Sequence, residues 1–427
     1  MTVALDWQQA FDHLNQDRIE TLEQRQIREA AFSRFQDRGW PDRKQEYWRY
    51  TDLNVLTQTA FMPATSVVPA IDHLLPAMKP DALSLIIVNG KLQPTTAVDA
   101  LIASGQLTIK KASVSLFSAT LAPHLQDAIT DLNDAFAEYC VDIHLQGIFS
   151  TPLHVIYIYT ALHDQMIHMQ QRWTVAADAS VTIIEEHIAE EGIRYFSTLK
   201  QYITLETQAD FSHCRLQTHS HLAYQINRIQ LSQAAHSKAK MVAVDSQGRL
   251  VRNELSQVFL GEHACLDVIG MYIGKQKTQT DNYVLVDHAS PHCQSQQRFK
   301  GILSDFAVGT YQGKVIVRPL AQKTDATQHH ANLLLSDDAK TNIQPQLEIY
   351  ADDIRCTHAT TTGTLDEEAL FYLSSRGIPL QQAKQMLLYG FMHDLIQSQP
   401  SIEIQSLFQR VIVDAFLSLS RSEEKRT

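Results

Sequence analysis

The strongest constraint on the fold is a long, almost unbroken series of short strand-like segments between residues 141 and 363. These segments are β-branched or aromatic runs, such as 155–159, 181–184 and 202–205, and they are bounded by Gly, Asp, Asn or Ser. A single β-sandwich takes only about 100 residues, whereas this series spans more than two hundred. The sequence therefore predicts a mainly β protein with a large β core.

The strand pattern alone leaves several β architectures open. A large barrel, two sandwiches, a propeller and a β-solenoid all suit many short strands. A propeller requires blade repeats of roughly 40–50 residues, and the sequence shows none. A solenoid with irregular coils does not need a visible repeat, so the missing repeat counts less against it.

Helical patterns flank the strands on both sides. Apolar residues recur at helical spacing between residues 5 and 53, and an aromatic-rich stretch, 45–51, is interpreted as packing these helices onto the next unit. After residue 363, Thr364 or Asp366 can cap a helix that Gly377 ends. We therefore expect an N-terminal helical region (1–80), a β core (81–363) and a C-terminal helical domain (364–427).

Composition and charge restrict the class of protein. The net charge of −11 argues against a general nucleic-acid binder, which needs a basic face. No apolar run approaches the ~18 residues of a membrane span, and the N-terminus lacks the pattern of a signal peptide. The five cysteines are scattered and form no C-x-x-C, which favours reduced thiols and a cytoplasmic location.

Several enzyme motifs are absent from the sequence. It contains no G-x-x-x-x-G-K-[ST], G-x-G-x-x-G, G-x-S-x-G or H-E-x-x-H. The chain therefore has no recognisable nucleotide-binding loop, nucleophile elbow or zincin helix, and we do not expect it to bind a nucleotide itself.

Cys356 and His358 are the most suggestive pair of chemical side chains. Residues two apart in a strand share a face, so a thiolate and an imidazole would lie side by side and could bind iron, zinc or a cluster edge. Two ligands do not complete a metal site, and a small buried Cys beside a hydrogen-bonded His is the structural alternative. Asp352 and Asp353 would suit a polysaccharide-cleaving β-solenoid, but adjacent strand residues face opposite ways, which favours a turn.

Whole phrases of the sequence resemble the SufB/SufD family of iron–sulfur cluster assembly proteins. The phrases occur in the family's order and are densest between residues 240 and 395. They are H-x-x-x-H-C-x-S-x-Q-x-F-K-G-I-L (288–303), G-K-V-x-V (313–317), A-Q-K-T-D-A (321–326), N-L-L-L-S (332–336), P-Q-L-E-I-Y-A-D-D (345–353), L-D and F-Y-L-x-S-R-G-I (365–378), with E-Y-W-R-Y-T (46–51) near the N-terminus. The phrase A-D-D-I-R-C-T-H (351–358) resembles the SufD branch.

The resemblance implies a right-handed parallel β-helix flanked by helices, in a non-catalytic scaffold subunit. SufB would pair with the end of the β-helix, where His358 and Cys356 would face a transient iron–sulfur cluster shared with SufB. The SufC ATPase would dock on the C-terminal helices, through Arg376, Gly377 and Phe391. The open edge of such a β-helix would allow the chain to pair with itself as a homodimer when SufB is missing.

Two other functions remain open from the sequence. One is a β-solenoid polysaccharide-active enzyme, although no carboxylate pair of suitable separation is evident in the strand region. The other is the SufB-type role of primary scaffold, which the low number of cysteines disfavours.

Overall fold

The computed structural model describes residues 7–16, 18, 20–64, 71, 73–75, 83–113, 125–161, 163–399 and 401–424. Within them, the strands form two ten-stranded sheets. Sheet A contains β1 (Met62–Pro63), β4 (Leu107–Ala112), β5 (Cys140–Leu145), β7 (Gln165–Val175), β9 (Tyr195–Leu205), β11 (Tyr224–Gln233), β13 (Leu250–Phe259), β15 (Gln279–His288), β17 (Val308–Val317) and β19 (Lys340–Ile349). Sheet B contains β2 (Leu83–Val88), β3 (Lys91–Leu92), β6 (Leu153–Tyr159), β8 (Ser180–Ala189), β10 (Asp210–Thr218), β12 (Lys238–Asp245), β14 (Cys265–Gly274), β16 (Gln294–Leu303), β18 (Asp325–Leu334) and β20 (Arg355–Gly363).

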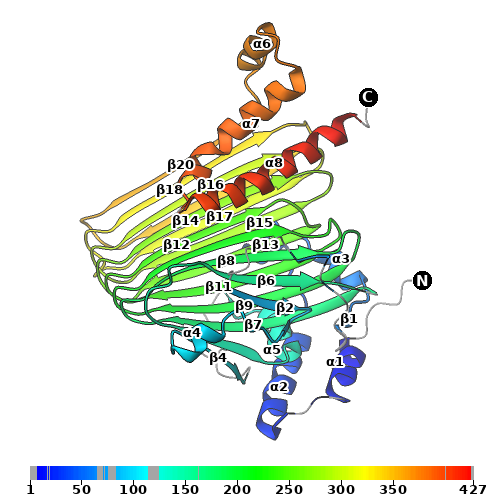
Figure 1. Cartoon of the computed structure of the whole chain (residues 1–427), viewed down its shortest axis with the longest axis vertical. Coiled ribbons are helices and arrows are strands. Elements are labelled where there is room, and N and C mark those ends of the chain that lie inside the picture. The colour runs from blue at the N-terminus through cyan, green and yellow to red at the C-terminus, as the bar shows by residue number, and fades with distance from the viewer. Residues whose placement is uncertain are drawn as a thin grey trace.

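The two sheets are the two sides of one parallel β-solenoid (Figure 1). From β5 to β20 the chain alternates between sheet A and sheet B, and each strand pairs in parallel with the strand two further along the chain. The mainly β, solenoid architecture is therefore confirmed, with helices at both ends of the chain. Its right-handed sense and the three-part domain division stay predictions.

The coils differ in length, which explains why the sequence shows no repeat. Residues that pair on neighbouring coils are 26 positions apart at Tyr224 and Leu250, but 32 apart at Val308 and Lys340. The strands keep nearly the same length, so the difference lies in the turns. A search for a fixed period cannot detect such coils.

One corner of the solenoid is a column of left-handed residues, one from each coil. They have φ between 58° and 62° and are Asp178, Gln208, His236, His263, His292 and Lys323. The amide of each donates a hydrogen bond to a carbonyl of the next coil, for example His236 N to Glu262 O at 2.9 Å and His292 N to Gln322 O at 2.9 Å. The His263 and His292 rings stack 4.7 Å apart. The six residues are called the turn column below, and its histidines are part of the turns of the solenoid.

Side chains alternate between the interior of the solenoid and its outer faces. On β10, His213 lies inside and bonds the buried Glu185, whereas Cys214 faces outward into a second hydrophobic cluster. The interior core is apolar for most of its length but contains many buried polar side chains in hydrogen-bonded networks. The parallel strands thus have two buried faces, as is typical of such sheets.

The C-terminal helices are α6 (Glu367–Ser375), α7 (Leu380–Gln397) and α8 (Ile402–Glu424), and the last two cover the outer face of sheet B. Residues of α7 and α8, such as Met392 and Phe408, share a buried cluster with Val242 and Ile269 of sheet B. In contrast, α6 projects beyond the solenoid (Figure 1). Among the described helices, none has the length and hydrophobicity that crossing a membrane requires.

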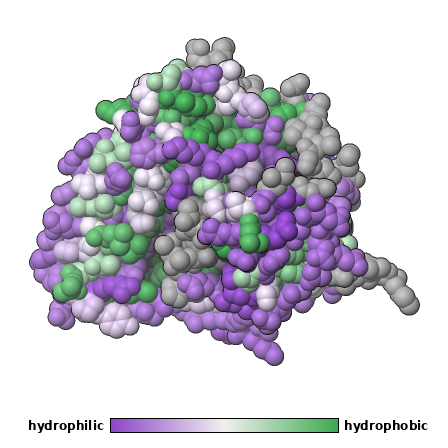
Figure 2. Space-filling model, turned by 90° about the horizontal axis from the view of Figure 1, so that it is seen from below, coloured by the Kyte–Doolittle hydropathy of each residue, from purple (hydrophilic) through white to green (hydrophobic). Residues whose placement is uncertain are grey.

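The N-terminal segment packs against the outer face of sheet A. Its helices are α1 (Trp7–Gln16), α2 (Leu22–Arg38), η1 (Glu46–Trp48) and α3 (Asn54–Gln58). Two further helices, α4 (Asp99–Ala103) and α5 (Ala128–Phe136), lie between the first strands. Trp48 is buried against the guanidinium of Arg252, 4.2 Å from the ring centroid, and Thr51 donates to Asp281 of β15 at 2.6 Å. The aromatic stretch therefore attaches this segment to sheet A, as expected. Seen from the end that carries α1 and α2, most of the surface is hydrophilic (Figure 2).

Candidate functional site

The last coil forms an open end of the solenoid. Within the described part of the chain, β20 pairs only with β18, and β19 pairs only with β17. Both strands therefore present an unpaired backbone edge, which is a template for pairing with another chain. No described coil covers the interior side chains of this coil from above, so they are accessible although they point inward.

Cys356 and His358 both belong to the inward-facing row of β20. The register pairs Cys356 with Ala326 and His358 with Gln328 of β18, and those two partners are buried in the interior. Because paired residues of parallel strands point to the same face, Cys356 and His358 lie side by side above the solenoid interior. The shared face that the spacing predicts is therefore present.

The Cys356 thiol is partly withdrawn from water. It is half-buried and packs against the interior hydrophobic core. Burial raises the pKa of the thiol, and the nearby Asp325 carboxylate raises it further. In this chain alone, Cys356 is therefore a thiol rather than a thiolate at neutral pH, and a metal ion would have to displace its proton.

His358 is exposed, and it makes no hydrogen bond or ion pair to any other described residue. An imidazole in this state has both ring nitrogens available to a ligand. Across the described residues, no three His, Cys, Asp or Glu side chains converge closely enough to hold a metal ion. The Cys356–His358 pair thus offers two ligands, and further ligands have to come from another molecule.

Gln328 is a residue of this site that the sequence does not single out. It lies directly beneath His358 and is 3% exposed, and neither atom of its side-chain amide has a hydrogen-bond partner among the described residues. Beneath it, Gln297 accepts a hydrogen bond from Tyr311 at 2.7 Å, while its Nε2 is also unpartnered in the described structure. A column of His358, Gln328 and Gln297 therefore leads from the open end into the interior.

Only the register reveals this column. His358 and Gln328 are 30 positions apart in a chain with coils of unequal length. The alternation within 325–334 is the one signal in the sequence, since it places Gln328 on the same face as buried Ala326. That signal does not indicate which residue of the next strand lies above.

The residues expected at the ATPase-docking surface lie in two different settings. Arg376 and Gly377 are exposed at the end of α6, where Gly377 has a φ of 84°. Phe391 is half-buried at the base of α7, and the Lys300 ammonium lies 5.0 Å from its ring centroid. Two aromatic residues of α6 are more exposed, Phe371 at 76% and Tyr372 at 56%. The sequence includes both in a family phrase but assigns neither to the surface.

Asp352 and Asp353 lie in an exposed turn between β19 and β20. Asp353 pairs with Lys323 of the turn column, and its backbone carbonyl accepts the Lys323 amide at 2.6 Å. The turn interpretation is therefore confirmed, and the two carboxylates do not face each other across a groove.

Comparison with known proteins relates most of the solenoid to one family. Residues 159–391 match the model described as "SUF system FeS cluster assembly, SufBD core domain". This match includes β7 to β20, α6 and most of α7, and therefore contains Cys356, His358 and Gln328.

Curated relatives are similar over most of their length. The iron–sulfur cluster assembly protein SufD of Escherichia coli is 28% identical over 84% of this chain and 85% of its own. An iron–sulfur cluster assembly SufBD family protein of Synechocystis is 26% identical over 87% of this chain and 86% of its own. The SufD protein of Bacillus subtilis is 25% identical over 58% of this chain and 57% of its own.

Proposed function

This chain belongs to the SufB/SufD family, SufD branch, and has a role in iron–sulfur cluster assembly, and from this premise we propose that it is a non-catalytic scaffold subunit that pairs with SufB and SufC. The observation that carries the proposal is the open last coil. It combines two unpaired strand edges with an inward row that contains Cys356 and His358. SufB would dock on this end and enclose that row.

The chemistry of the pair suits a transient cluster as cargo. The imidazole of His358 is a borderline ligand and the thiolate of Cys356 a soft one, and both bind iron. SufB would supply the remaining ligands, so the nascent cluster would be shared between the two subunits. Because burial raises the pKa of Cys356, iron binding would release its proton.

Gln328 would act as a positioning residue in this site. A ligating histidine usually hydrogen-bonds through its second ring nitrogen, which fixes the ring orientation. The unpartnered Gln328 amide lies one coil below His358, at the ~4.8 Å spacing of paired strands. It would bond one ring nitrogen of His358 when the other binds iron.

The C-terminal helices would connect the SufC ATPase to this site. The exposed Phe371, Tyr372 and Arg376 would form the docking surface of α6, while α7 is fixed to sheet B. Lys300 of β16 donates to the Phe391 carbonyl at 2.7 Å and to the Asp394 carboxylate at 2.6 Å. ATP-driven closure of two SufC subunits would therefore pull on sheet B, whose edge strand carries His358.

The accessibility of the cysteines favours the SufD role over that of a primary scaffold. Cys140, Cys214 and Cys293 are buried, and only Cys265 and Cys356 are partly accessible. Burial raises the pKa of all five thiols. A primary scaffold needs several reactive thiolates at its surface.

The decisive experiment co-expresses this chain with SufB and SufC, then measures iron and acid-labile sulfide in the purified complex. We expect His358→Ala to leave the subunit ratio unchanged and to lower both contents by about tenfold, because a ligand is lost. His329→Ala is the matched control, since His329 is an exposed histidine on the outer face of the neighbouring strand. Equal iron and sulfide in all three complexes would refute the assignment of His358.

A second variant tests the ATPase surface. Phe371→Asp places a charge in the centre of the exposed face of α6, and we expect SufC to be lost while SufB still co-purifies. Leu22→Asp on α2, where Leu22 is 73% exposed, controls for a general effect of surface charge. Retention of SufC by Phe371→Asp would place its docking surface elsewhere.

A further inference from the structure

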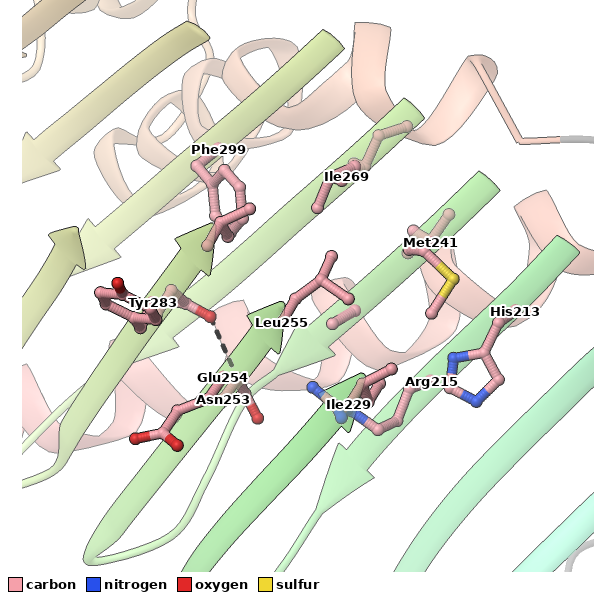
Figure 3. Close-up of a pocket in the computed structure, with 15 residues that line it drawn as sticks. His213, Arg215, Ile229, Met241, Asn253, Glu254, Leu255, Ile269, Tyr283 and Phe299 are labelled. Carbon is pink, nitrogen blue, oxygen red and sulfur yellow. Dashed lines mark hydrogen bonds between the residues drawn. The ribbon is translucent and has the colours of Figure 1, made fainter. Parts of the chain in front are cut away.

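A cavity of about 50 Å³ lies in the middle of the solenoid, between sheets A and B (Figure 3). Its inward-facing lining includes Arg215 of β10, Asn282 of β15 and Phe299 of β16. A single water needs roughly 10–15 Å³ measured in this way. The cavity therefore has room for a few waters or for one ion of moderate size.

Small residues create the space above Arg215. In the register of sheet B, Arg215 is followed on the next two coils by Ala243 and Gly270, and then by Phe299. The Phe299 ring lies directly against Gly270. A Cβ at that glycine would be only 2.1 Å from a ring carbon, so a larger residue would not fit. The side chain that would otherwise cover the Arg215 guanidinium is therefore missing on two successive coils.

Within the described part of the chain, Arg215 is a buried cation without a counter-ion in contact. It is 4% exposed, and its Nε and Nη1 have no hydrogen-bond partner in the described structure. No described carboxylate lies within ion-pair distance of it. An unpaired buried charge is expensive, so a partner for Arg215 is expected in the adjoining cavity.

The two nearby carboxyl groups are occupied by other donors. Glu185 accepts hydrogen bonds from His187 at 2.8 Å, His213 at 3.0 Å and Gln201 at 2.8 Å. The second, Asp245, is also buried; burial raises its pKa, while the nearby Arg215 charge lowers it. Its oxygens accept from Gln217 and from Asn253, the latter at 2.7 Å. Asp245 therefore acts on Arg215 only from a distance, and Nε and Nη1 of Arg215 stay without a hydrogen-bond partner among the described residues.

The cavity wall selects the chemistry of its ligand. Among the described inward-facing side chains of the wall, the unpartnered buried polar atoms are all donors, namely Nε and Nη1 of Arg215 and Nδ2 of Asn282. The rest of that wall is largely apolar, with Ile229, Met241, Leu255, Val268 and Val284. Such a wall suits an acceptor without protons that loses its hydration shell easily.

We propose that this cavity binds one small, weakly hydrated monoanion of the halide class, held by Arg215 and Asn282. The size of the cavity excludes a phosphate with its hydration shell, and the apolar wall disfavours the strongly hydrated fluoride. The bound anion neutralises Arg215 and fills the space that Ala243 and Gly270 leave open. This proposal concerns the interior of the solenoid and does not depend on the function proposed above.

Anomalous diffraction tests the site directly in the unaltered protein. Crystals of the full chain are grown in sodium bromide, and we expect an anomalous peak next to the Arg215 guanidinium and Asn282 Nδ2. The same crystals measured below the bromine absorption edge are the control, and the peak should disappear there. Bromide peaks only at the protein surface, with none in the cavity, would overturn the proposal.

Thermal unfolding in a halide series gives an independent test. At constant ionic strength, weakly hydrated anions generally destabilise proteins relative to strongly hydrated ones. In the wild type we expect bromide and iodide to raise the unfolding midpoint by about 2 °C relative to that trend, with a saturable dependence on concentration.

Asn282→Asp is the informative variant, because it supplies an internal carboxylate to Arg215 in place of the anion. We expect it to fold and to lose the saturable halide effect. Asn342→Asp, on the last coil and outside the cavity, should retain the effect. An identical halide response in the wild type and in Asn282→Asp would overturn the proposal. If that variant does not fold, the bromide crystals of the wild type decide.

Discussion

The middle of the solenoid and its last coil carry the same kinds of polar side chains in the same inward rows, but in different states. In the middle, His213 is buried and bonds Glu185, whose carboxylate accepts three hydrogen bonds. At the last coil, His358 stands in the same row of sheet B, five coils away, and has no such partner among the described residues. Burial by the next coil is what separates the two states.

This difference teaches that position along the solenoid decides the role of a polar side chain. A histidine covered by further coils satisfies its hydrogen bonds within the chain and stabilises the fold. A histidine on the last coil keeps its bonding capacity for another molecule. The cavity at Arg215 is an exception within the middle, where the register leaves a charge unpaired.

The largest loss of stability should follow the removal of Arg228, a buried charge that faces outward from sheet A. Arg228 donates hydrogen bonds to Asp127 at 2.5 and 2.7 Å and forms an ion pair with Glu254 at 2.7 Å, and it is 3% exposed. Arg228→Met leaves the buried Glu254 and the partly buried Asp127 without this partner, and we expect it to lower the free energy of unfolding by about 3–5 kcal/mol in urea titrations. Arg194→Met, which removes an exposed ion pair with Asp164, should cost less than about 1 kcal/mol.

The pH dependence of this effect has a defined sign. Burial alone would raise the pKa of Asp127, but the Arg228 guanidinium holds this pKa below its usual value. The stabilisation is therefore fully present above the unfolded pKa of about 3.9 and is lost as the pH falls through the folded value. The difference between wild type and Arg228→Met should shrink below about pH 4, and a difference that grows in acid would contradict this account.

A pair of histidine variants compares the two regions directly. His213→Ala removes one partner of the buried Glu185, and we expect a loss of about 2–3 kcal/mol in the free energy of unfolding. His358→Ala removes no described contact and should stay within about 0.5 kcal/mol of the wild type. Equal destabilisation by the two variants, measured by urea titration, would show that the last coil is covered in the isolated chain.

Gln328→Leu separates stability from function at the open end. The substitution removes two unpartnered amide atoms, so the isolated chain should gain up to about 1 kcal/mol in the free energy of unfolding. The iron content of the complex with SufB and SufC should nevertheless fall. Gln201→Leu, in the middle, removes a bond to Glu185 and should destabilise by about 1–2 kcal/mol. A destabilised Gln328→Leu would mean that this amide has a structural partner.

The smallest effect concerns thiol reactivity. Burial raises the pKa of Cys356, so its alkylation by iodoacetamide should be slower than that of a free cysteine at pH 7.5 and should still be accelerating at pH 9. Burial raises the pKa of Cys214, on the covered middle, to about 12, and this thiol should not react while the chain is folded. Peptide mass spectrometry after timed alkylation measures both rates. A faster reaction at Cys214 than at Cys356 would reverse the comparison.

The sequence by itself determined the features that depend on neighbours along the chain. Strand composition indicated the large β core, and the period of two placed Cys356 and His358 on one face. Capping chemistry located the start of α6, where the Asp366 side chain accepts from the Glu368 amide at 2.9 Å, and Gly377 marked its end. The resemblance to the SufB/SufD family supplied the solenoid and the role in cluster assembly.

Only the tertiary structure decided which residues of different coils meet. Gln328 lies beneath His358, and Ala243 and Gly270 open a cavity above Arg215, because of a register across coils that differ in length by several residues. Local periodicity fixes which way a side chain faces, whereas hydrogen bonding between coils fixes what lies above and below it. The unpartnered groups at His358, Gln328 and Arg215 arise from that second, long-range set of contacts.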